Sequence, residues 1–138
     1  MTDIGLEARI RVLEAREAIK EARARYARHA ALGEFSKVAD LFTVDGVFTP
    51  PGFPSIRGRE QIRAFLSRSG PGQVVPLIHN EVIQIQGDTA VGGCAMESRY
   101  APNSPDGFVG YYDDRLRLED GEWLFTERTF TFYERAKD

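Results

Sequence analysis

Several polar side chains that could transfer protons lie in or near a strand-like stretch between residues 78 and 133. His79 titrates near neutral pH and could serve as a general base. Asp114 shares a strand face with apolar residues, where a carboxyl group can act as an acid or a base. Arg128 stays protonated and could bind an oxyanion, and Tyr26 could hydrogen-bond a substrate carbonyl. If these side chains face one enclosed space, the pattern predicts a proton-transfer site.

Each of these residues also has a purely structural interpretation. His79 could be satisfied by neighbouring backbone or lie exposed at the mouth of a cavity. Tyr26 could pack as a core aromatic with its hydroxyl at the rim. Asp114 and Arg128 could form an ion pair that only shapes the wall. The residue types therefore leave a catalytic site and a structural cluster both open.

The composition limits the partners and cofactors of this 138-residue chain. The formal net charge of −3 and the pI near 5.5 argue against nucleic acid as the main partner. No stretch approaches the roughly 20 apolar residues that span a bilayer, and the charged N-terminus is unlike a signal peptide. One cysteine, Cys94, excludes an internal disulfide, and the two histidines lack a carboxylate cluster at ligand spacing. We expect a single cytoplasmic domain, residues 1–138, without membrane contact, metal or cofactor.

The first third of the chain is predicted to be helical. Residues 4–32 are rich in Ala, Glu, Arg and Leu and contain no proline, which predicts one long helix. Thr2 or Asp3 could cap its start, and Gly33 could end it. Shorter helices are predicted over residues 34–42 and 59–67. One face of the long helix repeats apolar residues at spacings of three and four: Val12, Ala15, Ile19, Ala22, Tyr26 and Ala30.

The start of the long helix does not follow this stripe. Leu6, Ile10 and Leu13 point nearly the opposite way. The first turns therefore contact something other than this domain's own core, such as a partner subunit, or the helix breaks near residue 13.

The second half of the chain has the pattern of an antiparallel sheet. Residues 74–133 contain long extended stretches separated by the turn signals Gly87-Asp88, residues 102–107 and Asp120-Gly121. Residues 45–57 add a strand and a turn. Helices first and an antiparallel meander afterwards predict an α+β domain with helices packed on one face of a sheet.

Strand parity gives two further expectations. In a regular strand Ile83 and Ile85 share the side of His79, whereas Ile78 and Val82 share the other, although a single β-bulge would switch this. The last strand would place large apolar groups on both faces: Leu124, Phe130 and Phe132 with Arg128 on one, and Trp123, Phe125 and Tyr133 on the other. A sheet open to water on one side should alternate more cleanly, so we expect a homodimer that packs sheet to sheet.

Several segments resemble SnoaL-like proteins of the nuclear transport factor 2-like superfamily. They are LEARIRVLEAREAIKEARARY, IHNEVIQIQGDTA, the Gly110, Tyr112 and Asp114 pattern, and DGEW followed by Arg128. The resemblance covers nearly the whole chain. It implies a cone, in which a strongly curved mixed sheet wraps around a pocket closed by three N-terminal helices, and which is often dimeric. The family includes dehydratases, isomerases, polyketide cyclases, epoxide hydrolases and members without catalysis.

The resemblance also suggests roles for single residues. Tyr26 matches a tyrosine late in the first helix, and Arg128 matches an arginine five residues after the strand tryptophan. His79 with Asn80 matches a common variant of the family pattern. Many relatives carry an aspartate that works with a pocket histidine at the position of Ala31, so this chain lacks one usual member. We also expect Tyr112, Asn80, Phe48 and Phe130 to bind substrate.

Three functions remain open from the sequence. The first is a cofactor-free lyase or isomerase that removes a proton next to a carbonyl of a small hydrophobic cyclic molecule, giving dehydration, double-bond isomerisation or cyclisation. His79 would be the base, Tyr26 or Arg128 would stabilise negative charge, and Asp114 would orient or share protons. The second is a non-catalytic module that binds a hydrophobic ligand or scaffolds a partner, which Ala31 favours. The third and weakest is an epoxide hydrolase, which needs an Asp–Arg–Asp arrangement of which only two members are evident.

Overall fold

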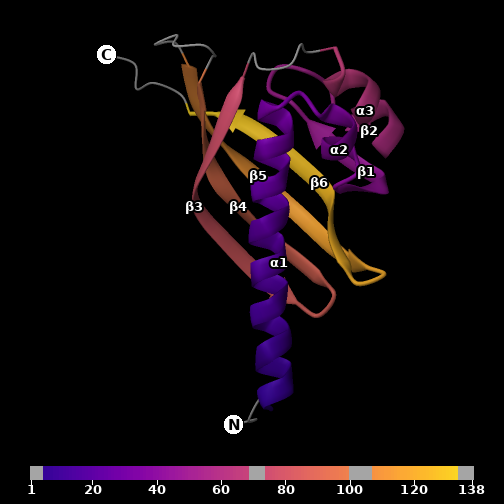
Figure 1. The fold of residues 1–138 in the computed structure, drawn as a ribbon, viewed down its shortest axis with the longest axis vertical. Helices are drawn as coiled ribbons and strands as arrows, with labels where there is room; N and C mark the ends of the chain where they lie inside the picture. Colours follow the sequence, from indigo (N-terminus) through magenta and orange to yellow (C-terminus); the bar gives the residue numbers. More distant parts are fainter. Residues whose placement is uncertain (1–4, 69–73, 100–106, 134–138) are drawn as a thin grey trace.

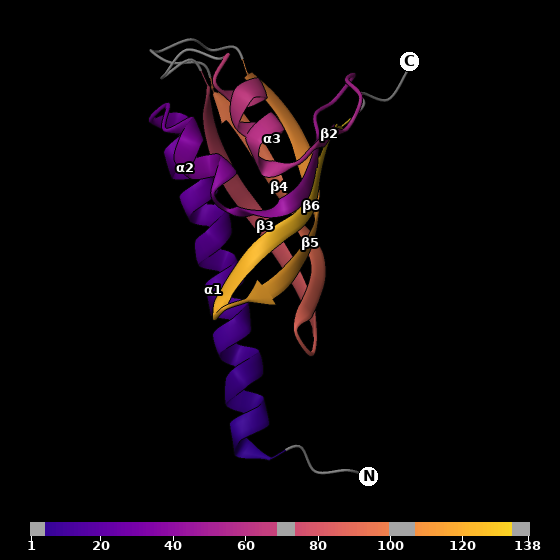
Figure 2. The same cartoon turned by 90° about the vertical axis from the view of Figure 1, so that its right-hand side faces the viewer.

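A six-stranded sheet and three helices form the described part of the domain. The computed structural model describes residues 5–68, 74–99 and 107–133. The helix α1 (Leu6–Ala31) runs along one face of the sheet (Figure 1). The short helices α2 (Phe35–Ala39) and α3 (Arg59–Leu66) lie near one end of that helix, beside the first strands. Figure 2 shows that the sheet is curved, with α1 on one side of it. We call the face covered by α1 the inner face and the opposite one the outer face.

The strands form one unclosed mixed sheet in the order β2-β1-β6-β5-β4-β3. The predicted antiparallel meander comprises β3 (Val75–Gln86), β4 (Thr89–Arg99), β5 (Gly107–Glu119) and β6 (Glu122–Phe132). The strand β1 (Phe42–Thr49) pairs parallel to β6 and antiparallel to the two-residue strand β2 (Ile56–Arg57). The expected α+β cone with a mixed sheet is therefore confirmed.

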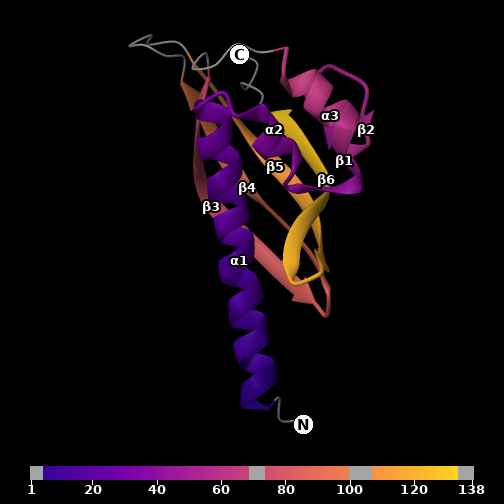
Figure 3. The ribbon, with the colours of Figure 1, turned by 45° about the vertical axis from the view of Figure 1, so that its right-hand side comes forward.

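The long helix is continuous from Leu6 to Ala31, which excludes the alternative of a break near residue 13. It ends before Gly33, whose φ of 75° suits glycine. Its predicted stripe supplies buried residues, among them Ile19 and Tyr26. The first turns extend beyond the sheet (Figure 3). Leu6 and Leu13 in these turns are 71% and 65% exposed. The predicted caps Thr2 and Asp3 lie outside the described residues. No helix in the described ranges is long and apolar enough to cross a membrane.

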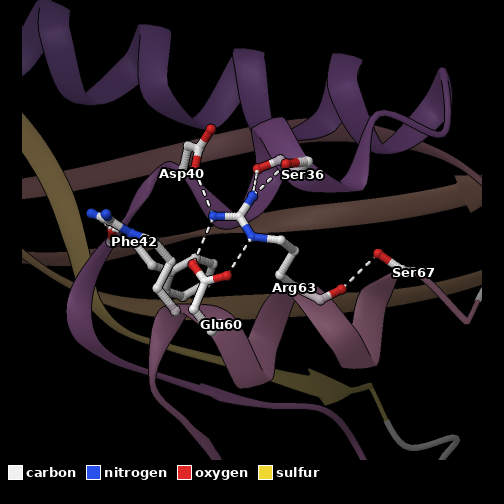
Figure 4. A network of polar contacts seen from close by, with 7 residues as sticks. Ser36, Asp40, Phe42, Glu60, Arg63 and Ser67 are labelled. Atoms are coloured by element: carbon white, nitrogen blue, oxygen red, sulfur yellow. Dashed lines mark hydrogen bonds and ion pairs between the residues drawn. The ribbon is translucent and has the colours of Figure 1, made fainter.

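The helix α2 is shorter than the predicted 34–42, because Phe42 begins β1 and is completely buried. Arg63 of α3 ties α2 to α3. Its guanidinium donates to the Ser36 carbonyl at 2.7 Å and to the carboxylates of Asp40 and Glu60 at 2.8 and 3.0 Å (Figure 4). This network holds the two short helices together where they flank β1.

A β-bulge in β3 reverses the direction of His79. The pairing with β4 shifts between His79 and Val82, and Asn80 has a φ of 52°. As a result Ile78 and Ile83 both pack on the inner core, and His79 points to the outer face. Of the two parities that the sequence left open, the structure therefore has the one that a β-bulge produces, with Ile83 and His79 on opposite faces. The small residue Gly92 on β4 makes room for the bulge, because a Cβ there would lie 2.0 Å from the Val82 carbonyl oxygen.

A second β-bulge, in β6, changes which side chains of this strand face the core. The register with β5 shifts so that Thr126 is an extra residue between Phe125 and Glu127. Trp123 and Phe125 therefore pack in the inner core together with Phe130, whereas regular alternation would place them on the opposite face. The outer face still carries exposed apolar side chains, but they come mainly from other strands: Leu77, Val82, Val91, Val109 and Tyr133.

The bulge gives a test of local backbone strain. Asn80→Val should destabilise the fold by about 1–2 kcal/mol, because a β-branched residue is strained at positive φ. Asn80→Gly should be neutral or mildly stabilising. Urea unfolding of both variants measures this, and equal stabilities would contradict a left-handed Asn80.

Candidate active site

Among the described residues, three charged side chains are completely buried on the inner side of the sheet. They are Arg23 of α1, Asp114 of β5 and Arg128 of β6. The Asp114 carboxylate lies between the two guanidiniums, with Oδ2 3.1 Å from Nε of Arg23 and Oδ1 2.9 Å from Nε of Arg128. Asp114 and Arg128 are direct neighbours across β5 and β6. Because a buried charge is costly without a partner, this row is held together by its own ion pairs.

The guanidinium of Arg128 is also enclosed by aromatic rings. Its central carbon lies 3.5 Å from the ring centre of Tyr112, 4.2 Å from that of Tyr26 and 4.6 Å from that of Phe125. Nη2 approaches the Cys94 sulfur at 3.7 Å, and Nη1 has no hydrogen-bond partner among the described residues. Burial alone would lower the pKa of Arg128, but Asp114 and the nearby phenols raise it above its ordinary value. Arg128 is therefore a permanent positive charge against the faces of two tyrosines.

Tyr26 and Tyr112 form a pair of protonated phenols. Their ring centres are 5.9 Å apart in an edge-to-face contact. Burial raises the pKa of Tyr26 well above 10.0, and Tyr112 raises it further. Burial likewise raises the pKa of Tyr112. Both hydroxyls are therefore proton donors rather than bases at neutral pH.

The tyrosine pair lines an apolar cavity of about 250 Å³. The two phenols are the polar side chains among its described lining. The other lining residues come from α1, α2, α3 and most strands and include Phe35, Phe48, Leu66, Met96, Phe108 and Phe130. A larger hollow of about 610 Å³ lies on the outer face. We take the smaller cavity as the candidate site, because it lies between helices and sheet and combines apolar walls with polar groups at one place.

Comparison with known proteins agrees with this architecture. A model of the SnoaL-like domain matches residues 11–129. The chain belongs to the SnoaL-like domain family. An NTF2-like protein with a cystatin-like fold from Novosphingobium aromaticivorans is 25% identical, with a TM-score of 0.86 over 99% of this chain and 94% of that one. A variant of the Mycobacterium tuberculosis protein Rv3472, described as of unknown function, is 26% identical, with a TM-score of 0.81 over 98% of this chain and 80% of that one.

A third solved structure is similar to this chain in fold only. It is a candidate scytalone dehydratase from Novosphingobium aromaticivorans, 23% identical, with a TM-score of 0.74 over 90% of this chain and 91% of that one. No curated protein matches the chain. Membership of the SnoaL-like family thus establishes the fold. Because the family includes dehydratases and cyclases, the reaction of this member must be inferred from its own residues.

The structure brings together most of the predicted site of this SnoaL-like chain. Tyr26, Tyr112, Phe48 and Phe130 line one cavity. Asp114 and Arg128 lie behind the tyrosines and outside the described lining of that cavity. In this part of the site the predicted residues converge.

His79 and Asn80 do not join this group. The His79 side chain is 52% exposed on the outer face, with Nε2 3.6 Å from a Glu97 oxygen. Asn80 is exposed and borders the outer hollow. The expected convergence of His79 with Asp114 in one pocket is therefore absent from the structure. Ala31 is the last residue of α1, and its neighbour Ala30 lines the cavity instead.

Sequence reasoning missed two charged members of the site. Arg23 lies four residues after Ile19 and three before Tyr26, so an arginine within the buried stripe was a readable signal. Its Nη1 lies 3.4 Å from a carboxylate oxygen of Glu81. Regular alternation along β3 places Glu81 on the side of Ile83, which packs in the inner core, so its position in the strand was a second readable signal. Within the described residues, no group of three His, Cys, Asp or Glu side chains could hold a metal ion.

The raised pKa of Tyr26 predicts a pH dependence of stability. Tyrosine in the unfolded chain loses its proton near pH 10, whereas folded Tyr26 keeps it, so the free energy of unfolding should fall as pH rises above about 10. The slope contributed is at most about 1.4 kcal/mol per pH unit. Tyr26→Phe should flatten this fall, and Tyr133→Phe, which removes a 55% exposed phenol, should not. Urea unfolding followed by Trp123 fluorescence measures it, and identical slopes in the two variants would contradict a buried, protonated Tyr26.

Proposed function

We propose that this chain is a cofactor-free enzyme of the lyase or isomerase type acting on a small hydrophobic cyclic molecule. The observation that supports this most is the pair of protonated phenols in an otherwise apolar cavity, with Arg128 stacked against both rings. Apolar walls would hold a ring system, and the phenols would bind its carbonyl oxygen. A cavity of about 250 Å³ suits a ligand of one or two rings.

The chemistry follows from what the phenols can donate. Hydrogen bonds from Tyr26 and Tyr112 to a carbonyl oxygen would stabilise the enolate that forms when the neighbouring C–H bond breaks, and the charge of Arg128 would add to this. In a dehydration a C–H and a C–O bond break, a C=C bond forms, and the hydroxyl departs with the proton as water. Return of the proton to another carbon instead gives a double-bond isomer.

The proton that leaves the carbon needs an acceptor. The described lining of the cavity contains no carboxylate or imidazole, and Asp114 is occupied by two guanidiniums. His79 lies on the other face of the sheet. We therefore propose that water, or the departing hydroxyl of the substrate, takes the proton while the tyrosine pair stabilises the oxygen.

Hydrogen exchange on a model ketone tests the proposal without knowledge of the natural substrate. The protein should accelerate deuterium uptake next to the carbonyl of 1-tetralone in D₂O, measured by NMR. Tyr26→Phe and Tyr112→Phe should each reduce the acceleration about tenfold to a hundredfold, because each removes an oxyanion donor. The matched control Tyr133→Phe should leave it unchanged. The proposed enzymatic activity would be refuted if calorimetry shows that a panel of cyclic ketones binds and none of them exchanges faster in the presence of the protein.

The alternative is a module that binds a hydrophobic ligand without turning it over. The absence of a carboxylate or imidazole from the described cavity lining favours this second function. Binding without exchange in the same experiment would select it. The epoxide hydrolase has less support. Arg23 lies between the carboxylates of Asp114 and Glu81, but none of these three side chains belongs to the described lining of the cavity.

We also propose that two copies pack through their outer faces. The support is the set of exposed apolar side chains there, with Val82, Val109 and Tyr133 between 51% and 64% exposed. Arg115 and Glu127 lie among them, 3.9 Å apart, and supply opposite charges that a two-fold arrangement can pair.

A lysine on this face should weaken the dimer. Val109→Lys should raise its dissociation constant at least about tenfold, because it places a charge among apolar groups. Val44→Lys alters an exposed valine on β1 and serves as the matched control. Light scattering at micromolar concentration measures the mass. A wild-type mass near the monomer's 15.5 kDa would contradict the proposal.

A further inference from the structure

The row of buried charges continues beyond the residues that contact the tyrosines. Arg23 donates through Nη2 to the Val82 carbonyl at 3.3 Å, and its Nη1 lies 3.4 Å from a Glu81 oxygen. Both partners belong to the bulge of β3. The row therefore runs from Arg128 through Asp114 and Arg23 to Glu81, whose side chain is 26% exposed.

Two unusual backbone features serve this end of the row. Asn80 adopts a positive φ, and this turns Glu81 to the inner face, where regular alternation after His79 would point it outward. Gly92 leaves the space that the Val82 carbonyl occupies. Strained backbone persists where the surrounding structure requires it, often at functional sites. Here both features provide ligands for the guanidinium of Arg23.

The charges of the row do not cancel within the buried part. Arg23 and Arg128 are two cations around one buried anion, Asp114, and Glu81 supplies the second anion at a partly exposed position. The other titratable groups that face the row are the Cys94 thiol of β4 and the phenols of Tyr26 and Tyr112. These are neutral at neutral pH, because burial raises the pKa of each.

We propose that Arg23 is a positioning residue and that Arg23 and Glu81 set the positive charge behind the tyrosine pair, so that the cavity favours ligands whose oxygen is ionised or enolic. The inference rests on the proposed function and adds to it the charge state of the ligand. Arg23 holds Asp114, which holds Arg128 against the phenols, and neither Arg23 nor Glu81 touches the ligand itself. Glu81 reduces the net charge from its place at the bulge.

The ionisation of a bound phenol measures this charge. 4-Nitrophenol titrates near neutral pH, and its absorbance reports the ionised fraction while it is bound. 4-Nitroanisole has the same ring without the proton and reports the packing of the cavity alone. Binding of both is measured across the phenol's titration range for the wild type, Glu81→Gln and Arg23→Gln.

The two variants should shift the preference in opposite directions. Glu81→Gln removes a negative charge and should raise the ratio of nitrophenolate to nitrophenol affinity roughly threefold to tenfold. Arg23→Gln removes a positive charge, keeps a donor for Asp114, and should lower the ratio by a similar factor. Affinity for 4-nitroanisole should stay within about twofold of the wild type in both. Glu81→Gln is the milder change. If Arg23→Gln does not fold, the ratio measured for Glu81→Gln alone tests the inference.

The outcomes separate this inference from the proposed function. If the folded variants bind 4-nitroanisole normally and leave the ratio unchanged, the row only supports the fold and the inference is overturned, while the proposed function stands. If the wild type binds neither probe, the cavity is not a ligand site and both fail. Opposite shifts with unchanged 4-nitroanisole binding support the inference.

Discussion

The inner half of this domain is organised around the buried charge of Arg128. A guanidinium without water costs several kcal/mol unless partners replace its hydration. Asp114 supplies the counter-charge, and the faces of Tyr26, Tyr112 and Phe125 supply cation–π contacts, each worth about 0.5–2 kcal/mol. The ring positions are thereby fixed by electrostatics as well as by packing. The two tyrosine rings that line the cavity are therefore positioned by this one cation.

This arrangement explains why α1 must meet β5 and β6 where it does. Tyr26 contacts Arg128 from the helix, and Arg23, almost one turn earlier, contacts Asp114 from the same helix. Two side chains of one helix thus engage an ion pair that spans two strands. A slide of α1 along the sheet would break both contacts at once and leave buried charges unpaired. The row of buried charges therefore fixes the placement of a helix that apolar packing alone would hold less specifically.

Alternation and helical spacing predicted the elements, whereas the two bulges decided which side chains meet. The helical stripe correctly placed Tyr26, and the strand patterns correctly placed Asp114 on an apolar face and Arg128 on the face of Phe130. His79 lies on the outer face instead, because a single extra residue after it puts His79 and the later core residue Ile83 on opposite faces of the strand. Asparagine tolerates positive φ better than most residues, but the sequence around it does not distinguish a bulge from a regular strand.

Arg23 shows that a sequence pattern can indicate a buried charge without identifying its partner. A charge inside an apolar stripe signals a buried partner, yet the partner's identity depends on the register between α1, β3 and β5, which spacing along one chain does not encode. The bulge that removes His79 from the cavity is also the bulge that turns Glu81 toward Arg23. One irregularity therefore separates an imidazole from a carboxylate that regular alternation would place on the same face. The carboxylate of Glu81 lies at the end of the row and outside the described lining of the cavity. The described lining of such a site contains no carboxylate or imidazole, whereas the cation of Arg128 lies against its two tyrosine rings. This arrangement is better suited to stabilising an oxyanion than to abstracting a proton.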